Sequence, residues 1–298
     1  MPYRPERPVS ISAIWARRLG RFALALGIAA LIFHRLGLLA LPNAVAVILL
    51  SAALAILVVG LSAIGFAMLW LIGAKGGRAS FFGFVMAALV LGPVGYAASR
   101  YFTLPKIHDV STDLVDAPEW LQPPQVTPSW LPRAVQITPA MRGAQAEAYP
   151  NLTGRRYDGA IDRVLDAVAA VAADRKWKLV ADDGADFLVP DASPSPAEQT
   201  EDGFVDPDNV PVPEARPDFE NEPAVVTQPV VVLQYTWKSL VFGIPYDIVV
   251  RLVEEEETTF VDMRSATREG DHDLGLNAAL VRGFLRDLDV ALLGIAGG

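Results

Sequence analysis

The residues best suited to chemistry gather in one stretch near the C-terminus. This stretch contains Arg264, Arg268, Asp271, His272 and Asp273. The residue types predict a strand that leads directly into the N-terminus of a helix. Such an end offers free N–H groups and a positive dipole, and arginines nearby strengthen the attraction for an anion. We therefore expect an anion or lipid-headgroup site at Arg264 and Arg268, with Arg251 as a third candidate.

The same stretch also has a structural interpretation. Asp271 and Asp273 are anions that can occupy the helix N-terminus and pair with the arginines themselves. Gly270 and Gly275 would then let the two backbones approach closely. Under this interpretation the junction is held by Asp247, Asp262, Gly270, Asp271, Asp273, Gly275 and Asn277.

A hydrolase is the alternative from another functional class. Ser265 or Ser111 would be the nucleophile, with His272 or His108 as the base. The part of the sequence after residue 102 contains no G-x-S-x-G elbow, H-E-x-x-H pair, P-loop or G-x-G-x-x-G motif. We therefore expect a binding protein rather than an enzyme, with a hydrolase that uses His272 and Ser265 as the alternative.

Metal ligands are sparse in this chain. It has no Cys and three His, which excludes disulfides, thiolate zinc sites and cysteine nucleophiles. His108 and Asp109, close to Asp113, are weak metal candidates, because Asp and Ser in such a segment more commonly cap a turn. We expect no metal and no cofactor.

These residues follow an apolar block at residues 22–102, which we expect to form three transmembrane helices. Leu36 to Ala74 contains no Asp, Glu, Lys or Arg, and roughly 20 helical residues cross a bilayer. The first span covers residues 22–33 and extends back to Ala16 with snorkelling arginines. The others cover about 44–73 and 80–102. A signal peptide cleaved near Ala44-Val45-Ala46 is the alternative for the first span.

Basic residues predict the orientation of these spans. The N-terminal arm, residues 1–21, has five arginines, and the loop between the second and third spans has Lys75 and Arg78. The loop between the first and second has only Arg35. The positive-inside rule then places the arm in the cytoplasm and residues 103–298 in a periplasm, with membrane lipids as partners. No Asp, Glu or Lys lies inside a span, which argues against a transporter.

The pattern after the membrane block predicts an α+β domain. A proline-rich strap at residues 106–149 precedes a helix at 158–173, with Asp158 as its N-cap. Further strands are expected at residues 177–181, 230–237, 246–253 and 260–265, and a last helix at 273–293. We expect a mainly antiparallel sheet packed against these two helices.

Alternation predicts a charged face on one hairpin of this sheet. Tyr246, Ile248, Val250 and Leu252 share one face, and Asp247 and Arg251 share the other. A register that keeps Val261 and Met263 with the apolar residues puts Asp262 and Arg264 on the charged face. Cross-strand salt bridges are the structural explanation of such a face.

An acidic, proline-rich segment interrupts the domain at residues 190–229. Its ten acidic residues and its single basic residue, Arg216, give this segment a net charge of −9. The net charge of the whole chain has the same value. We expect a disordered insertion, with binding of an envelope protein partner as the alternative. A charge distribution without a basic face excludes nucleic acid as a partner.

The segment Val261 to Asn277 resembles the signature of the DUF1499 family, a domain of unknown function. A strand ends in Arg-Ser and is followed by a second Arg, a Gly and Asp-x-Gly-x-Asn. Ile107 to Asp113 resembles the leading segment of the family, and Tyr246-Asp247 with Arg251 resembles its preceding strand. The anchored arrangement is similar to the longer proteobacterial members. The resemblance implies a multi-pass inner-membrane protein with a periplasmic binding or envelope-organising module, and it supplies no reaction.

Overall fold

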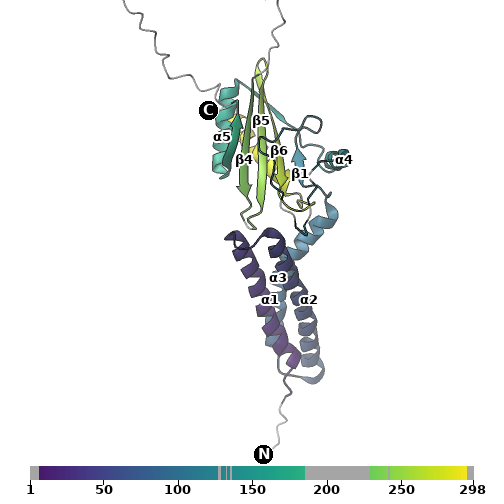
Figure 1. Cartoon of the computed structure of the whole chain (residues 1–298). Helices are drawn as coiled ribbons and strands as arrows, with labels where there is room; N and C mark the ends of the chain where they lie inside the picture. The colour runs from purple at the N-terminus through teal and green to yellow at the C-terminus, as the bar shows by residue number, and fades with distance from the viewer. Residues whose placement is uncertain are drawn as a thin grey trace, which may run out of the picture.

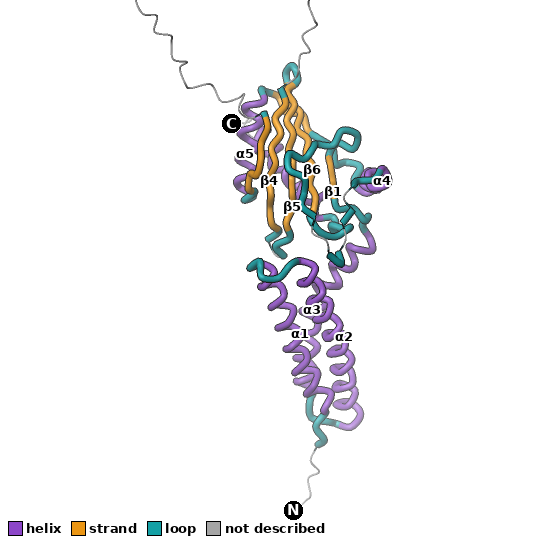
Figure 2. Tube along the Cα trace, in the orientation of Figure 1, coloured by secondary structure: helices purple, strands orange, loops and turns teal. Residues whose placement is uncertain are grey.

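The computed structural model describes residues 7–126, 129–131, 133–134, 136–184, 229–240 and 242–293. A bundle of three helices leads into a sheet domain, which stands on one end of the bundle (Figure 1). The N-terminus lies at the other end (Figure 2). The expected acidic insertion at residues 190–229 lies outside the described residues, apart from Pro229.

The bundle consists of α1 (Ile11–Arg35), α2 (Leu41–Ile72) and α3 (Gly77–Thr103). The Ser10 side chain caps α1 by accepting a hydrogen bond from the Ala13 N–H at 3.3 Å. Gly73 ends α2 in the left-handed conformation, which glycine adopts without strain. By length and composition α2 and α3 can each cross a membrane, whereas α1 with its arginines does not meet that criterion.

Small side chains fill the interior of the bundle and large apolar ones face outward. The interior contains Ala16, Ala55, Val58, Ala87 and Val90. Exposed positions include Phe22, Ile56, Trp70, Leu71 and Phe81. A bundle in water would bury its large apolar residues, so this distribution fits helices packed against each other within lipid.

Helices α1 and α3 touch through their backbones. A Cβ atom added at Gly83 would lie 2.8 Å from the backbone carbon and oxygen of Ala16, and one added at Gly20 would lie 3.2 Å from the Gly83 oxygen. No such contact exists at Gly92, further along α3. Only glycine allows the approach at Gly83, and small residues serve the same purpose in closely packed membrane helices.

The domain contains a six-stranded antiparallel sheet with the order β1-β6-β5-β4-β3. Its strands are β1 (Asp109–Ser111), β2 (Arg155–Asp158), β3 (Lys178–Asp183), β4 (Val230–Lys238), β5 (Pro245–Glu254) and β6 (Thr258–Thr267). Strands β1 and β2 both pair with β6, at opposite ends of that strand. The first strand after the helix bundle, β1, thus joins the sheet by pairing with β6.

Two helices cover one face of the sheet, as the sequence predicts. The core joins side chains from α5 (Ile161–Asp174) and α6 (Leu276–Leu293) to the apolar face of β5 and β6. Trp177 stacks on Phe284 with 4.7 Å between ring centroids. Such aromatic contacts and the burial of the helix stripes supply most of the stability of the domain.

The sequence analysis does not predict two of the observed elements. Helix α4 (Pro139–Ala148) lies within the region expected to be an extended strap. Thr138 caps it and Pro139 begins it, a start signal that favours a helix. Strand β2 is also unexpected, and Asp158 is its last residue instead of an N-cap. Helix α5 begins after Ala160 without a side-chain cap, because pairing with β6 already positions this backbone.

We predict that Gly83→Ala destabilises the bundle. The added methyl group would meet the backbone of Ala16, and overpacking of this kind costs about 1–3 kcal/mol. Thermal unfolding of the full chain in detergent measures the loss. Gly92→Ala in the same helix is the control and should leave the melting temperature unchanged or raise it. Equal effects of both substitutions would contradict the close approach of α1 and α3.

Candidate functional site

The charged face of the hairpin exists as the alternation predicts. In the register of β5 and β6, Arg251 lies opposite Asp262, and Asp247 lies opposite Ala266. Arg264 lies on the same face, opposite Val249. The other face carries the apolar partners of α5 and α6. The charged residues therefore point away from the core of the domain.

The strap crosses this charged face and is pinned to it by hydrogen bonds. The amide of Gln234 in β4 receives the Gln122 N–H at 2.9 Å and donates to the Gln122 carbonyl at 2.7 Å. Arg264 donates to the carbonyl of Pro118 at 3.1 Å, and its guanidinium lies 4.9 Å from the centre of the Trp120 ring. The face is therefore covered by the protein itself.

Each candidate arginine is bound to a buried aspartate. Arg251 forms two hydrogen bonds with Asp262, at 3.1 and 2.6 Å. Arg268 likewise holds Asp247 at 2.9 and 2.7 Å. The carboxylate of Asp262 is fully buried, and that of Asp247 is 5 % exposed. Bidentate pairs of this kind use the edge of the guanidinium that would otherwise bind a phosphate.

Asp109 connects three elements through its carboxylate. Arg264 of β6 reaches it at 2.9 Å and Arg142 of α4 at 3.2 Å. The Asp109 side chain is fully buried. Sequence reasoning missed Arg142, because no periodic signal marked α4 and because Arg142 and Asp109 are far apart in the chain. Two guanidinium groups around one carboxylate leave this corner with positive potential, which disfavours a metal cation.

His108, the other weak metal candidate, is sealed inside the domain. Its side chain is fully buried, and neither ring nitrogen has a hydrogen-bond partner among the described residues. Burial lowers the pKa of His108 from its ordinary value near 6.5, and the Arg133 charge lowers it further. This shift favours the neutral imidazole at pH 7 in the folded protein. The described part of the chain contains no group of three or more His, Asp or Glu that could hold a metal.

The N-terminus of α6 is closed by the chain itself. The Asp273 carboxylate accepts hydrogen bonds from the N–H of Gly275 at 2.7 Å and of Asn277 at 2.9 Å. Helix α6 thus begins at Leu276, three residues later than expected, with Asp273 as the acceptor for its first turn. Burial raises the pKa of Asp273, although these hydrogen bonds oppose the shift. An incoming anion would find the N–H groups already used.

The glycines of the junction have distinct roles. Gly270 and Gly275 both adopt positive φ angles, of 80° and 72°. A Cβ atom on Gly275 would lie 2.7 Å from Leu104 and 2.8 Å from Arg100, so this position needs glycine for space as well. Asp271 is exposed, and no ion pair joins it to an arginine within the described ranges. Arg268 pairs with Asp247 instead.

The two residues of the hydrolase alternative are not brought together. Ser265 is fully buried on the helix-facing side, where its hydroxyl donates to Asn277 at 2.8 Å. His272 accepts the Leu274 N–H at Nδ1, so its Nε2 carries the proton and donates to the Leu104 carbonyl at 3.2 Å. The His272 ring stacks on Tyr101. The Nε2 atom and the ring face of His272 therefore join the domain to the end of α3, whereas Nδ1 is used within the domain.

We predict that Arg264→Gln destabilises the domain by about 3–5 kcal/mol, because it leaves one partner of a buried ion pair behind. Chemical denaturation followed by tryptophan fluorescence measures the change. Arg156→Gln is the control, since Arg156 pairs with Glu255 at the surface and should matter little. A comparable effect of both substitutions would rule out the buried network as a source of stability.

We predict a second effect at His108. Its folded pKa lies below that of the unfolded chain, so the unfolded state binds more protons as the pH falls below about 6.5, and stability falls in step. His108→Gln removes the contribution of this imidazole to the pH dependence of the free energy of unfolding. The free energy of unfolding of the variant should vary less than that of the wild type between about pH 7 and pH 5. Parallel pH profiles would show that His108 is not held neutral.

Comparison with known proteins gives one match. The model of the family described as "Protein of unknown function (DUF1499)" matches residues 131–288, which is more than half of the chain. The match begins in the strap and ends in α6, and it includes neither the helix bundle nor the segment Ile107 to Asp113. No curated protein and no solved structure matches the chain. The chain belongs to the DUF1499 family.

Proposed function

We propose that the protein is a membrane-anchored binding or envelope-organising module of the longer proteobacterial DUF1499 type. In this proposal α1, α2 and α3 cross the inner membrane, and the sheet domain stands in the periplasm. The observation that carries it is the bundle, with small residues inside and large apolar residues outside. Such a surface is stable in lipid and prone to aggregation in water.

The position of its arginines supports α1 as the third crossing. Between Trp15 and Phe33 the helix rises by roughly 27 Å, which matches a hydrocarbon core of about 30 Å. Helical side chains point toward the N-terminus of their helix, so Arg17, Arg18 and Arg21 can extend to the headgroups at that end. All three side chains are exposed.

Basic residues cluster at the end of the bundle that lies away from the domain. The segment before α1 meets the loop between α2 and α3 there, where the Lys75 N–H donates to the Pro8 carbonyl at 2.8 Å. Arg7, Lys75 and Arg78 belong to this end. The positive-inside rule makes it the cytoplasmic end and supports a periplasmic position for the sheet domain (Figure 1).

Several contacts hold the domain in one orientation on its anchor. Arg100 near the end of α3 donates to the Leu274 carbonyl at 2.7 Å. Tyr101 stacks on His272 with 4.9 Å between centroids. On the other side of the bundle, Arg35 donates to the Ser239 carbonyl at 3.2 Å. A domain held on both sides suits a module that presents one surface at a fixed height above the membrane.

The candidate catalytic groups favour a module over a hydrolase. Ser265 and His272 have separate partners, and the arginines that could stabilise a developing negative charge are already neutralised by aspartates. A hydrolase needs a nucleophile and a base in contact, beside an accessible site. Membrane lipids and an envelope protein are the partners that we infer for the module.

We predict the outcome of reporter fusions. Alkaline phosphatase fused after Gly298 should be active, since it folds only outside the cytoplasm, and a green fluorescent reporter at the same site should be dark. A second pair of fusions after Lys75 should give the reverse pattern and serves as the control. A fluorescent C-terminal fusion with inactive phosphatase would overturn the proposed orientation.

A further inference from the structure

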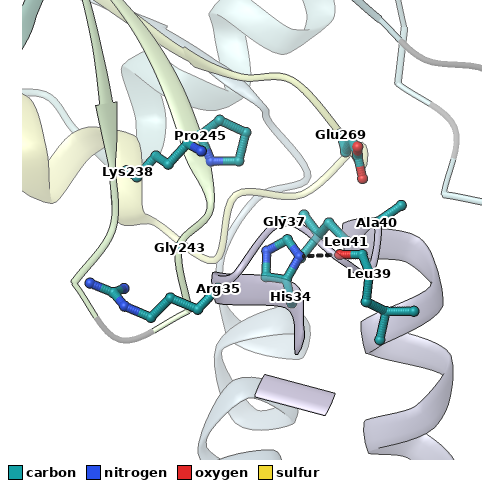
Figure 3. Close-up of a pocket in the computed structure, with 10 residues that line it drawn as sticks. All are labelled: His34, Arg35, Gly37, Leu39, Ala40, Leu41, Lys238, Gly243, Pro245 and Glu269. Carbon is teal, nitrogen blue, oxygen red and sulfur yellow. Dashed lines mark hydrogen bonds between the residues drawn. The ribbon is translucent and has the colours of Figure 1, made fainter. Parts of the chain in front are cut away.

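A cavity of about 360 Å³ lies where the bundle meets the domain. The corner between α1 and α2 forms one wall, and the turn between β4 and β5 forms the other (Figure 3). Glu269, which follows β6, closes one side. The charged residues that line the cavity are Arg35, Lys238 and Glu269, with His34 beside them. The polar groups thus come from three segments that are distant in the sequence.

Positive charge dominates this cavity. Arg35 donates from one nitrogen, Nη1, to the carbonyls of Ser239 and Leu240, which orients the side chain while its other nitrogens make no hydrogen bond among the described residues. Neither Arg35 nor Lys238 forms an ion pair in the part of the chain that the structure describes. Two cations against the single carboxyl of Glu269 give this partly open cavity a positive balance, which attracts an anion.

Two buried polar atoms at the cavity lack partners. The His34 Nδ1 lies 2.8 Å from the Leu39 carbonyl and therefore carries a proton, whereas Nε2 has no partner among the described residues. The Oε2 atom of Glu269 is likewise buried and unpaired. Burial raises the pKa of Glu269 from its ordinary value. Buried polar atoms normally have hydrogen-bond partners, so we expect a ligand to supply the partners of these two atoms.

The first turn of α2 adds a favourable dipole. Ala40 and Leu41 line the cavity, and no side chain caps this end of a helix of 32 residues. Pro42 has no N–H, so the donors that this turn can offer are the N–H groups of Leu41 and Asn43. This end of α2 presents a partial positive charge to the cavity. The dipole acts together with Arg35 and Lys238.

The surroundings place the cavity at the membrane surface. Leu240, at the turn between β4 and β5, is 71 % exposed, and Phe242 beside it is 40 % exposed. Large apolar side chains on a turn that faces the end of a transmembrane bundle suit the boundary between headgroups and acyl chains. A ligand at this level can bring a phosphate together with an apolar tail.

We propose that this cavity is a binding site for a phosphate group, that of an anionic phospholipid or that of a soluble phosphate. The inference rests on the proposed function only for the lipid as a source, because the cavity itself is independent of orientation. Lys238 and the first turn of α2 would donate hydrogen bonds to a phosphate, and Arg35, whose guanidinium points away from α2 along the turn between β4 and β5 (Figure 3), adds positive charge at the rim.

The test uses the full chain in nanodiscs of equal parts phosphatidylglycerol and phosphatidylcholine. Native mass spectrometry then measures the ratio of the two lipids that stay bound. The wild type should retain phosphatidylglycerol in excess, and Lys238→Gln should lower that excess about fivefold, as expected for one basic group near an anionic lipid. Arg35→Gln should act in the same direction. Lys106→Gln is the control, because Lys106 is exposed just after α3, outside the cavity.

A second arm identifies a soluble ligand. Inorganic phosphate is titrated into the chain in nanodiscs of phosphatidylcholine alone, and the melting temperature is followed. A rise that Lys238→Gln abolishes supports the site with soluble phosphate as its ligand, and a lipid preference that Lys238→Gln abolishes supports it with the lipid. Absence of both effects, or an equal loss in Lys106→Gln, overturns the proposal. Because nanodiscs expose both faces, this failure is distinct from a reversed orientation in the reporter fusions.

Discussion

The buried carboxylate of Asp109 is the constraint on which the sheet domain depends. It lies six residues after the end of α3 and has no exposed surface. A buried charge without partners costs several kcal/mol, so Asp109 is tolerated only when Arg264 and Arg142 are both in place. Folding of β1, the first strand after the helix bundle, is thereby tied to β6, the last strand of the sheet, and to α4.

The same pairing shapes the function that the chain can have. With Asp109, Asp247 and Asp262 each holding an arginine, the charged face is neutral in sum at its centre, and the strap covers it. Instead, two positive side chains that form no ion pair with a described residue lie at the end of the domain that meets the helix bundle. These are Arg35 and Lys238. The charge open to binding therefore lies where the bundle meets the domain, and the charged face of the hairpin has a structural explanation.

Sequence reasoning predicts those parts of the fold that depend on local periodicity. The alternation of Tyr246 to Leu252 and of Val261 to Met263 predicts that the two strands share one apolar face, and the observed register keeps these residues on one face. The apolar stretches likewise predict α2 and α3, both long enough to cross a membrane. In each case the signal repeats over many residues, so that single irregular positions do not hide it.

The features that sequence reasoning missed depend on partners distant in the chain. Strand β2 has only four residues and forms because β6 offers an edge beside β1. The choice of Asp109 as the partner of Arg264, in place of Asp271 or Asp273, follows from the pairing of β1 with β6. The cavity at Arg35 exists only because the bundle and the turn after β4 meet. A periodic pattern within one segment of the sequence does not reveal its contacts with distant segments.

The central claim is that Asp109 and Arg264 form one coupled, buried unit. A double-mutant cycle with Asp109→Asn and Arg264→Gln measures this coupling through the free energy of unfolding. The account predicts an interaction energy on the order of 3 kcal/mol, because either single substitution already breaks the pair of Asp109 and Arg264 and the second then costs little more. Additive effects of the two substitutions would contradict it.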